Sequence, residues 1–323
     1  MKVDLIIGAG QLGSRHLQGL LKLEQKQLIY VLDPSEESLK VAEQRAKEIP
    51  NMHDLHFITD WKDLPQVLDL VIVATGSGVR AAVATKLLES HTVHYLILEK
   101  VLFQDMDSYK EVGDLIASTK TKTWVNHPRR MFEHYHEIKS VLSEAKETVV
   151  YNIVGSNWGL ACNGLHYVDL FAYLSGSAVA SINMDWLDKT IHESKRANYI
   201  ELTGTFTGKL ENNDHFVVTS FDGSVPDFTM YISTYSHRWI IREGSGEIVY
   251  INKHNITEEK ETKFSPEYQS TLTTKIAQSL FDEGTCALPT YEEACASHMP
   301  FVNEALSKYI EISGQQTTFC PIT

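Results

Sequence analysis

A cluster of glycines near the start of the chain constrains the fold more than any other feature. Gly8, Gly10 and Gly13 follow a β-rich run at 3–7 and open a helical pattern at 12–23. In such a strand, turn and helix, the first glycine bends the chain, the second leaves the backbone bare, and the third lets the helix pack on the strand. The helix N-terminus then presents N–H groups to an anion such as a pyrophosphate.

An aspartate follows at the distance that a dinucleotide-binding domain requires. Asp33 lies twenty positions after Gly13, at the end of a second apolar run at 28–32. Its carboxylate can accept hydrogen bonds from ribose hydroxyls, and it repels a 2′-phosphate. Pro34 and Ser35 follow, without an arginine to receive that phosphate. The pattern therefore favours NAD over NADP as cofactor, although Asp33 could instead only cap the next turn.

Residues 1–125 alternate short apolar runs with helical patterns. Continuous apolar strands separated by helices predict an α/β domain with a parallel sheet covered on both faces, which is a doubly wound Rossmann domain. Ligands bind such sheets at the carboxyl ends of the strands. The residues expected to hold the cofactor lie at these ends: Gly8, Gly10, Gln11, Leu12, Gly13, Asp33, Thr75, Glu99, Lys100 and Asn126.

Residues 126–323 have a different pattern. A helical stretch near 131–143 is expected to be the last Rossmann helix, and a strand and a helix follow. From 180 to about 251, strand signals alternate with turns rich in Gly, Asn and Asp. This pattern predicts an α+β domain with a large, mostly antiparallel open sheet and helices on one face.

Composition and charge exclude several classes of partner. The net charge of −13 argues against nucleic acid and against an anionic membrane surface. No run of about 20 apolar residues is present that could span a membrane. The four cysteines form no CxxC pair, and the histidine pairs lack a matching ligand framework, so we expect no metal site. Reduced thiols and a cytoplasmic location are the simplest expectation.

Three further places in the sequence hold candidates for the chemistry. Lys100 ends the fifth predicted strand, where its ammonium could stabilise negative charge on a substrate oxygen, or could be only a solvated lysine. His166 and Asp169 share one helix face, and a histidine there could relay a hydroxyl proton or simply be packed. Arg129, beside Arg130, could hold an anionic substrate group or start a helix in a salt bridge.

Together these features resemble the Gfo/Idh/MocA family, the glucose–fructose oxidoreductase and inositol dehydrogenase superfamily. The resemblance rests on the run from Gly8 to His16, Glu99-Lys100, Asn126 with Arg129-Arg130, His166 with Asp169, and Leu288-Pro289-Thr290, in this order.

The resemblance implies NAD-dependent hydride transfer at a secondary alcohol or ketone of a sugar, polyol or sugar derivative, possibly nucleotide-linked. It implies that the open sheet forms the interface of a homodimer or homotetramer. It also implies catalytic roles for Lys100 and His166. The residues expected around the substrate are Lys100, Arg129, Cys162, His166 and Asp169.

Two positions depart from the family pattern. Val101 replaces the proline of the usual Glu-Lys-Pro, which loosens the backbone. Cys162 replaces an aspartate that often lies four residues before the histidine, and a thiol can pair with Lys100 only if it ionises. Three alternatives stay open: Lys100 and His166 suffice, the substrate differs, or the chain is a NAD(H)-binding regulator or scaffold with weakened catalysis.

Overall fold

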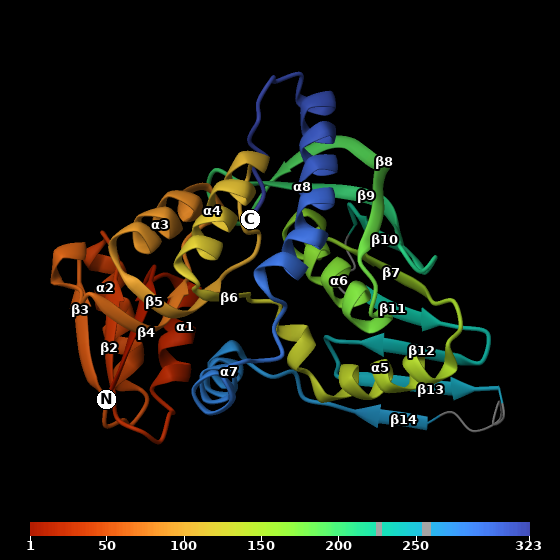
Figure 1. Ribbon diagram of the computed structural model, residues 1–323. Coiled ribbons are helices and arrows are strands. Elements are labelled where there is room, and N and C mark those ends of the chain that lie inside the picture. Colours follow the sequence, from red (N-terminus) through yellow and green to blue (C-terminus); the bar gives the residue numbers. More distant parts are fainter. Residues whose placement is uncertain (224–227, 254–259) are drawn as a thin grey trace. The chain divides into compact units, whose positions relative to one another are not determined.

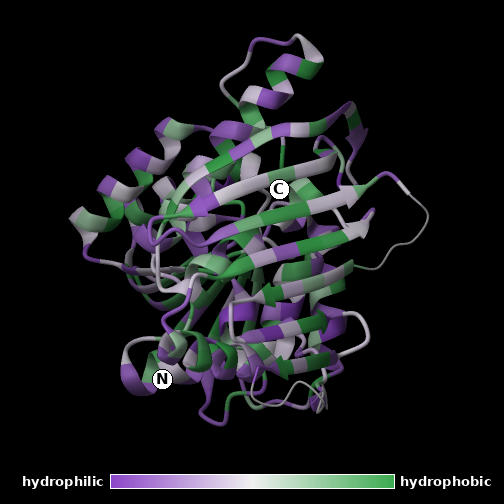
Figure 2. Ribbon diagram, turned by 90° about the vertical axis from the view of Figure 1, so that its right-hand side faces the viewer, coloured by the Kyte–Doolittle hydropathy of each residue, from purple (hydrophilic) through white to green (hydrophobic). Residues whose placement is uncertain are grey.

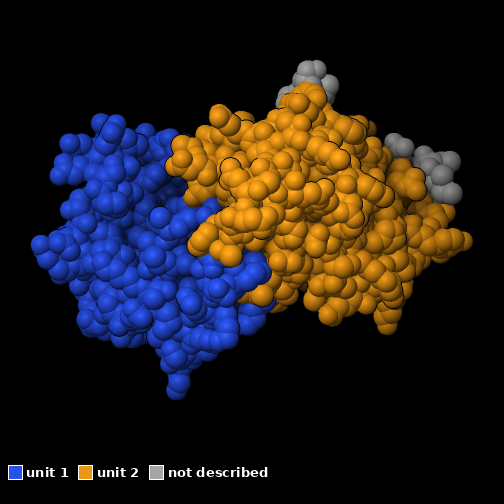
Figure 3. Space-filling view, turned by 90° about the horizontal axis from the view of Figure 1, so that it is seen from above, with its two compact units in different colours: residues 1–131, 267–292 blue, residues 132–266, 293–323 orange. Residues whose placement is uncertain are grey.

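The computed structural model describes residues 1–223, 228–253 and 260–323 (Figure 1). The chain divides into two compact units, coloured separately in Figure 3. The first unit comprises Met1–Met131 and Glu267–Glu292, and the second comprises Phe132–Pro266 and Glu293–Thr323. Each unit contains one β-sheet.

The sheet of the first unit has six strands in the order β3-β2-β1-β4-β5-β6, and every neighbouring pair is parallel. This order confirms the predicted doubly wound domain, because the strand order extends from β1 through β2 to β3 on one side and from β4 to β6 on the other. The strands are β1 (Lys2–Ile7), β2 (Gln27–Leu32), β3 (Asp54–Ile58), β4 (Val67–Val73), β5 (Thr92–Leu98) and β6 (Lys122–Val125).

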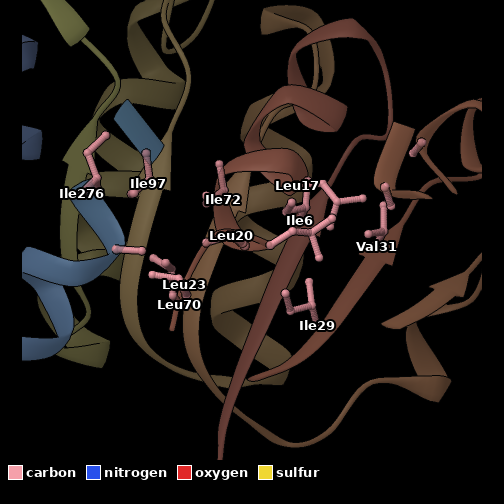
Figure 4. Packing of buried hydrophobic residues seen from close by; sticks show 14 of the residues in the cluster. Ile6, Leu17, Leu20, Leu23, Ile29, Val31, Leu70, Ile72, Ile97 and Ile276 are labelled. Carbon is pink, nitrogen blue, oxygen red and sulfur yellow. The ribbon is translucent and has the colours of Figure 1, made fainter. Parts of the chain in front are cut away.

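Successive side chains of the central strands point to opposite faces of this sheet, and both faces are covered by helices. On one face, strand residues such as Ile6, Ile29 and Ile72 pack in one cluster with Leu17 and Leu20 of α1 (Figure 4). The helices are α1 (Gln11–Leu20), α2 (Glu36–Lys47), α3 (Ser77–Ser90), α4 (Met106–Thr119) and α7 (Gln269–Glu283), with short 3-10 turns η1 (Trp61–Asp63) and η2 (Pro128–Met131). Ser35 caps α2 by accepting a hydrogen bond from the backbone N–H of Ser38.

Helix α7 comes from a distant part of the sequence and packs on α1 within the first unit. A Cβ atom at Gly19 would lie 2.5 Å from Cβ of Thr273, so the close approach of the two helices needs glycine there. Thr274 donates a hydrogen bond to the carbonyl of Gly19 (2.7 Å). The nearby Pro289 carbonyl accepts a hydrogen bond from the N–H of Val125 (3.0 Å), which places the 288–290 motif beside β6.

The sheet of the second unit has eight strands in the order β14-β13-β12-β11-β7-β10-β9-β8. Only β7 and β10 pair in parallel, so the predicted mostly antiparallel sheet is confirmed for the described residues. The strands are β7 (Val150–Ser156), β8 (Val179–Glu193), β9 (Ile200–Leu210), β10 (His215–Phe221), β11 (Phe228–Ser233), β12 (His237–Arg242), β13 (Glu247–Asn252) and β14 (Lys260–Lys263).

Three helices accompany this sheet: α5 (Glu133–Ala145), α6 (Leu160–Ser175) and α8 (Tyr291–Ser313), which starts in the last residues of the first unit. The ring of Phe171 on α6 stacks on Tyr151 of β7 and lies against Phe216 of β10. Helix α5 contacts α6, so the helix expected to end the Rossmann domain belongs to the second unit instead. Periodicity predicts that helix but carries no information about which sheet it covers.

The strands of the second sheet carry hydrophobic stretches (Figure 2). Val154 and Phe221 are 38% and 55% exposed. An interface between copies of the chain on this sheet stays a prediction. Among the described residues, no helix combines the length and the apolar character that a membrane span needs.

A buried carboxyl group interrupts the apolar pattern of β1. Asp4 is fully buried, and neither of its carboxyl oxygens has a hydrogen-bond partner among the described residues. Burial, followed by the charge of Asp69, raises the pKa of Asp4 to about 8. Folded Asp4 therefore keeps a proton at pH values where the unfolded chain has lost it. Its contribution to stability falls as the pH rises from about 4 to about 8.

We predict that Asp4→Asn stabilises the protein at high pH, because an amide removes the cost of ionising or protonating this buried group. The free energy of unfolding should rise by roughly 2 kcal/mol or more at pH 8 and change little near pH 4. Urea unfolding at both pH values measures the difference, with Asp54→Asn as control, because the half-exposed Asp54 is paired with Lys26 near the surface. An equal change at both pH values would contradict this interpretation of Asp4.

Candidate functional site

The β1–α1 turn depends on two of its three glycines for its shape. Gly8 has a φ of +100°, which residues with a side chain rarely adopt. A Cβ atom there would lie 3.1 Å from the backbone of Thr75. A Cβ atom at Gly13 would lie 1.8 Å from the carbonyl oxygen of Gly8. Helix α1 therefore approaches β1 more closely than any residue with a side chain permits.

The remaining glycine of the turn, Gly10, keeps a space open. Gly10 is the N-cap of α1, and a Cβ atom there would meet nothing within 4 Å. No side chain caps the helix, and the N–H groups of Gln11, Leu12 and Gly13 lie in the first turn, where no acceptor exists within the helix. Bare donors at the positive end of a helix, next to open space, fit a pyrophosphate.

Asp33 connects the end of β2 to this turn. Its Oδ2 accepts a hydrogen bond from the N–H of Ala9 (2.7 Å), and its Oδ1 accepts one from the N–H of Ser35 (2.8 Å). The carboxylate thus caps the turn that follows β2 and also braces the glycine turn. Each oxygen has a second lone pair, so Asp33 can still accept from a ribose hydroxyl.

Arg80 braces the strand ends on the other side of β1, a role that the sequence analysis missed. From α3 its guanidinium donates to the carbonyl oxygens of Thr75, Val101 and Leu102. Thr75 itself follows β4, and its hydroxyl is buried with no hydrogen-bond partner among the described residues. The only sequence signal for Arg80 was a cationic residue in the first turn of the helix that follows β4.

Glu99 is the centre of a buried hydrogen-bond network. It is 3% exposed, so it is not a surface charge. Its Oε1 accepts hydrogen bonds from His16 Nε2 (2.9 Å) and Asn126 Nδ2 (2.6 Å). Burial on its own raises the pKa of Glu99, but these hydrogen bonds and the charges of His16 and Arg80 together hold it below its usual value.

Helix α7 completes this network. His16 Nδ1 and the hydroxyl of Thr273 share a hydrogen bond of 2.9 Å. Asn126 Nδ2 also donates to Oε1 of Gln269 (3.0 Å), while the Oδ1 atom of Asn126 is buried with no partner among the described residues. His16 belongs to the glycine motif, but nothing local in the sequence indicates that Thr273 and Gln269 reach the same place.

Cationic side chains gather where β5 and β6 end. Lys100 is 7% exposed, which excludes a solvated strand-end lysine, and the Lys100–Val101 peptide bond is cis. Burial, and then the charges of Arg130, Lys100 and Arg129, hold the pKa of His127 well below its usual value. Three positive charges therefore act on the His127 ring and favour its neutral form. This arrangement favours an anionic group, or an oxygen that gains negative charge.

The first unit thus brings together, at the carboxyl ends of its strands, the residues that the sequence predicted for cofactor binding. The remaining candidates lie in the second unit, on α6. Asp169 is buried, and Cys162 and His166 are half-buried and one helical turn apart. The backbone N–H groups of Ala161 and Cys162 donate to Oε1 of Glu201 on β9. Glu201 was not recognised from the sequence.

A metal centre is not evident in the part of the chain that the structure describes. No group of three or more His, Cys, Asp or Glu side chains there could hold a metal ion. No disulfide links the four cysteines.

Comparison with known proteins places this geometry in context. Residues 4–127 match the model of the Gfo/Idh/MocA family, which is described as an oxidoreductase family with an NAD-binding Rossmann fold. A search among curated protein sequences found no match.

Solved structures share the fold of the chain at low sequence identity. The super-repressor mutant of Gal80p from Saccharomyces cerevisiae has a TM-score of 0.75 at 13% identity, covering 98% of this chain and 100% of that one. An oxidoreductase from Agrobacterium radiobacter, in complex with NAD+, L-tartaric acid and magnesium, has a TM-score of 0.72 at 13% identity. The match covers 97% of this chain and 99% of that one. UDP-N-acetylglucosamine 3-dehydrogenase from Acidithiobacillus ferrooxidans has a TM-score of 0.68 at 14% identity. The match covers 97% of this chain and 98% of that one.

We predict that the Glu99 network stabilises the first unit in a pH-dependent way. Because its folded pKa is lowered, Glu99 contributes stability above the ordinary glutamate pKa, and this contribution is lost as the pH falls through the folded pKa. Glu99→Gln should cost roughly 3 kcal/mol of unfolding free energy at pH 7, since it breaks a buried charged interaction. The cost should shrink towards pH 4.

Urea unfolding at several pH values measures this cost. Glu43→Gln is the matched control, because Glu43 pairs with Lys47 on the exposed surface of α2. If Glu99→Gln lowers the unfolding free energy at pH 7 no more than the control does, the buried network does not stabilise the fold.

Proposed function

We propose that this protein, residues 4–127 of which match the Gfo/Idh/MocA family of oxidoreductases with an NAD-binding Rossmann fold, transfers a hydride between NAD and a sugar-like molecule. The reacting carbon is that of a secondary alcohol or ketone. The observation that carries the proposal is the turn at Gly10. There, open space adjoins the first N–H groups of α1, which have no acceptor within the helix. The dehydrogenase from Acidithiobacillus ferrooxidans, which acts on a nucleotide-linked sugar, supports the substrate class.

NAD is the cofactor that the residues fit better. Asp33 lies beside the glycine turn and accepts a hydrogen bond from its backbone. Its negative charge repels a 2′-phosphate at this position, while its second lone pairs suit ribose hydroxyls. The relative from Agrobacterium radiobacter, solved with NAD+, is consistent with this choice.

Bound NAD supplies the nicotinamide carbon that accepts or gives the hydride. Lys100, inside the cationic cluster at the ends of β5 and β6, holds the substrate oxygen and stabilises its negative charge. Glu99, fixed by His16 and Asn126, positions the backbone next to Lys100. The proton relay is assigned to His166 from the sequence alone and is tested by substitution.

We predict that Gly10→Ala weakens cofactor binding without harming the fold. A Cβ atom there meets no protein atom but occupies the space reserved for the pyrophosphate. Calorimetric titration should show NADH affinity weakened about tenfold or more, with the unfolding free energy changed by less than about 1 kcal/mol. Gly13→Ala is the contrast, because its Cβ atom clashes with Gly8 and should destabilise the fold. Unchanged NADH affinity in Gly10→Ala would place the cofactor elsewhere.

We predict that Lys100→Ala lowers kcat roughly 10²- to 10³-fold while NADH affinity is retained, because the lost charge acts on the reacting oxygen. His166→Asn should lower kcat roughly 10²-fold through loss of the proton relay. A panel of polyols and sugars with NAD, followed at the NADH absorbance, measures both. Full activity in Lys100→Ala would remove this residue from the mechanism.

A second candidate function is that of a dinucleotide-binding regulator. Cys162 stands where the family often has an aspartate, and the regulator Gal80p from two yeasts shares the fold. The same assay separates the candidates. A regulator binds NADH, turns over no member of the panel, and gains no activity from Cys162→Asp.

A further inference from the structure

Asn126 carries a buried acceptor that no described protein group satisfies. The residue follows β6 at the carboxyl edge of the first sheet and is 2% exposed. Its backbone N–H donates to the carbonyl of Leu98 (2.8 Å), which holds it at the strand end. Its Oδ1 atom accepts no hydrogen bond from any described residue. A buried carbonyl oxygen without a donor destabilises a fold unless a ligand or a water molecule satisfies it.

The orientation of the Asn126 amide follows from its neighbours. Nδ2 donates both of its protons, one to Oε1 of Glu99 (2.6 Å) and one to Oε1 of Gln269 (3.0 Å). Glu99 is an ionised carboxylate at neutral pH, because its hydrogen bonds and the nearby charges outweigh the effect of burial on its pKa. A carboxylate only accepts, so turning the amide around would set Oδ1 against this negative charge.

Helix α7 holds the same orientation from its side. Nε2 of Gln269 donates to the hydroxyl oxygen of Thr273 (3.1 Å), which leaves Oε1 of Gln269 to face Asn126. The hydroxyl of Thr273 in turn donates to the carbonyl of Gln269 (2.8 Å). The Asn126 amide therefore cannot turn to find a donor for Oδ1 without breaking these bonds, and Oδ1 is the part of the amide left for a ligand.

The order of the strands indicates which part of a dinucleotide would reach this acceptor. From β1 the sheet continues through β4 and β5 to β6, which is three steps of ~4.8 Å, or roughly 14 Å. The pyrophosphate is assigned to the helix that follows β1, and Asp33 suits the adenosine ribose on the β2 side. The nicotinamide end then extends towards β6. Its ribose hydroxyls lie nearer the pyrophosphate, and its carboxamide –NH₂ is the donor farthest along this direction.

We propose that Oδ1 of Asn126 accepts a hydrogen bond from the carboxamide –NH₂ of the nicotinamide, and that Asn126 thereby selects cofactors that carry this amide. The inference rests on the proposed function, because it takes NAD as the cofactor. A carboxamide held in this way cannot turn freely, so the ring that carries the reacting carbon is presented in one orientation. The Glu99 network then acquires a second role, since it engages both donors of Asn126 and reserves the acceptor.

The experiment compares three reduced dinucleotides on the full chain by isothermal titration calorimetry. These are NADH, its thionicotinamide analogue, which keeps the –NH₂ group, and its 3-acetylpyridine analogue, in which a methyl group replaces it. The thionicotinamide analogue should bind within about threefold of NADH. The acetylpyridine analogue should bind about tenfold or more weakly, because its methyl group leaves the buried Oδ1 without a donor.

Asn126→Ala tests whether this discrimination comes from Asn126. The ratio of the two dissociation constants, acetylpyridine analogue over NADH, should fall to about threefold or less, because the acceptor is gone. A loss of stability alone does not change this ratio, since both dinucleotides bind the same folded protein. Gln269→Ala is the matched control: it removes one hydrogen bond of the same amide but keeps Oδ1 and the bond to Glu99. Its ratio should stay at about tenfold or more, even where its Tm falls.

Two results would overturn the proposal while leaving the proposed function intact. One is a wild-type chain that binds the acetylpyridine analogue as tightly as NADH. That result would also follow if Oδ1 met a ribose hydroxyl or only water, because all three dinucleotides share the same ribose. The other is an Asn126→Ala variant that keeps the full ratio, which would assign the –NH₂ group to a different residue. A chain that binds none of the three dinucleotides would contradict the proposed function itself, and this inference with it.

Discussion

The close approach of α1 to β1 is the contact on which the first unit depends. A Cβ atom at Gly13 would lie 1.8 Å from the carbonyl of Gly8, so only bare backbone permits this packing. The approach fixes the N-terminus of α1 beside the ends of β2 and β4. The N–H groups of that terminus and the space at Gly10 suit the pyrophosphate of a dinucleotide. The carboxylate of Asp33, beside them, suits its ribose hydroxyls.

The same helix also reaches the chemical end of the domain. His16, one turn after Gly13, holds Glu99 at the end of β5, and Thr273 of α7 holds the other side of its ring. The residue that follows Glu99 is Lys100, within the group of cations around His127. The glycine turn and the charged strand ends are therefore fixed by one continuous set of buried contacts rather than by separate loops.

Local pattern was sufficient to predict the parallel sheet, the glycine turn and the strand ends, because each is encoded within about thirty residues of sequence. Contacts between distant segments could not be predicted in this way. Helix α7 joins the first unit through Gly19 and Thr273, and α5 joins the second, although both show only an ordinary helical period. Arg80 and Glu201 were missed for the same reason, since their partners are backbone groups brought near by the fold.

The central claim is that a nicotinamide dinucleotide docks on the first turn of α1. Backbone amide NMR of the labelled chain during titration with NADH tests it directly. The account predicts that the largest shift changes fall on the N–H signals of Gly10, Gln11, Leu12 and Gly13, with smaller ones near Asp33. Saturable NADH binding that leaves these signals in place, or no binding at all, would contradict it.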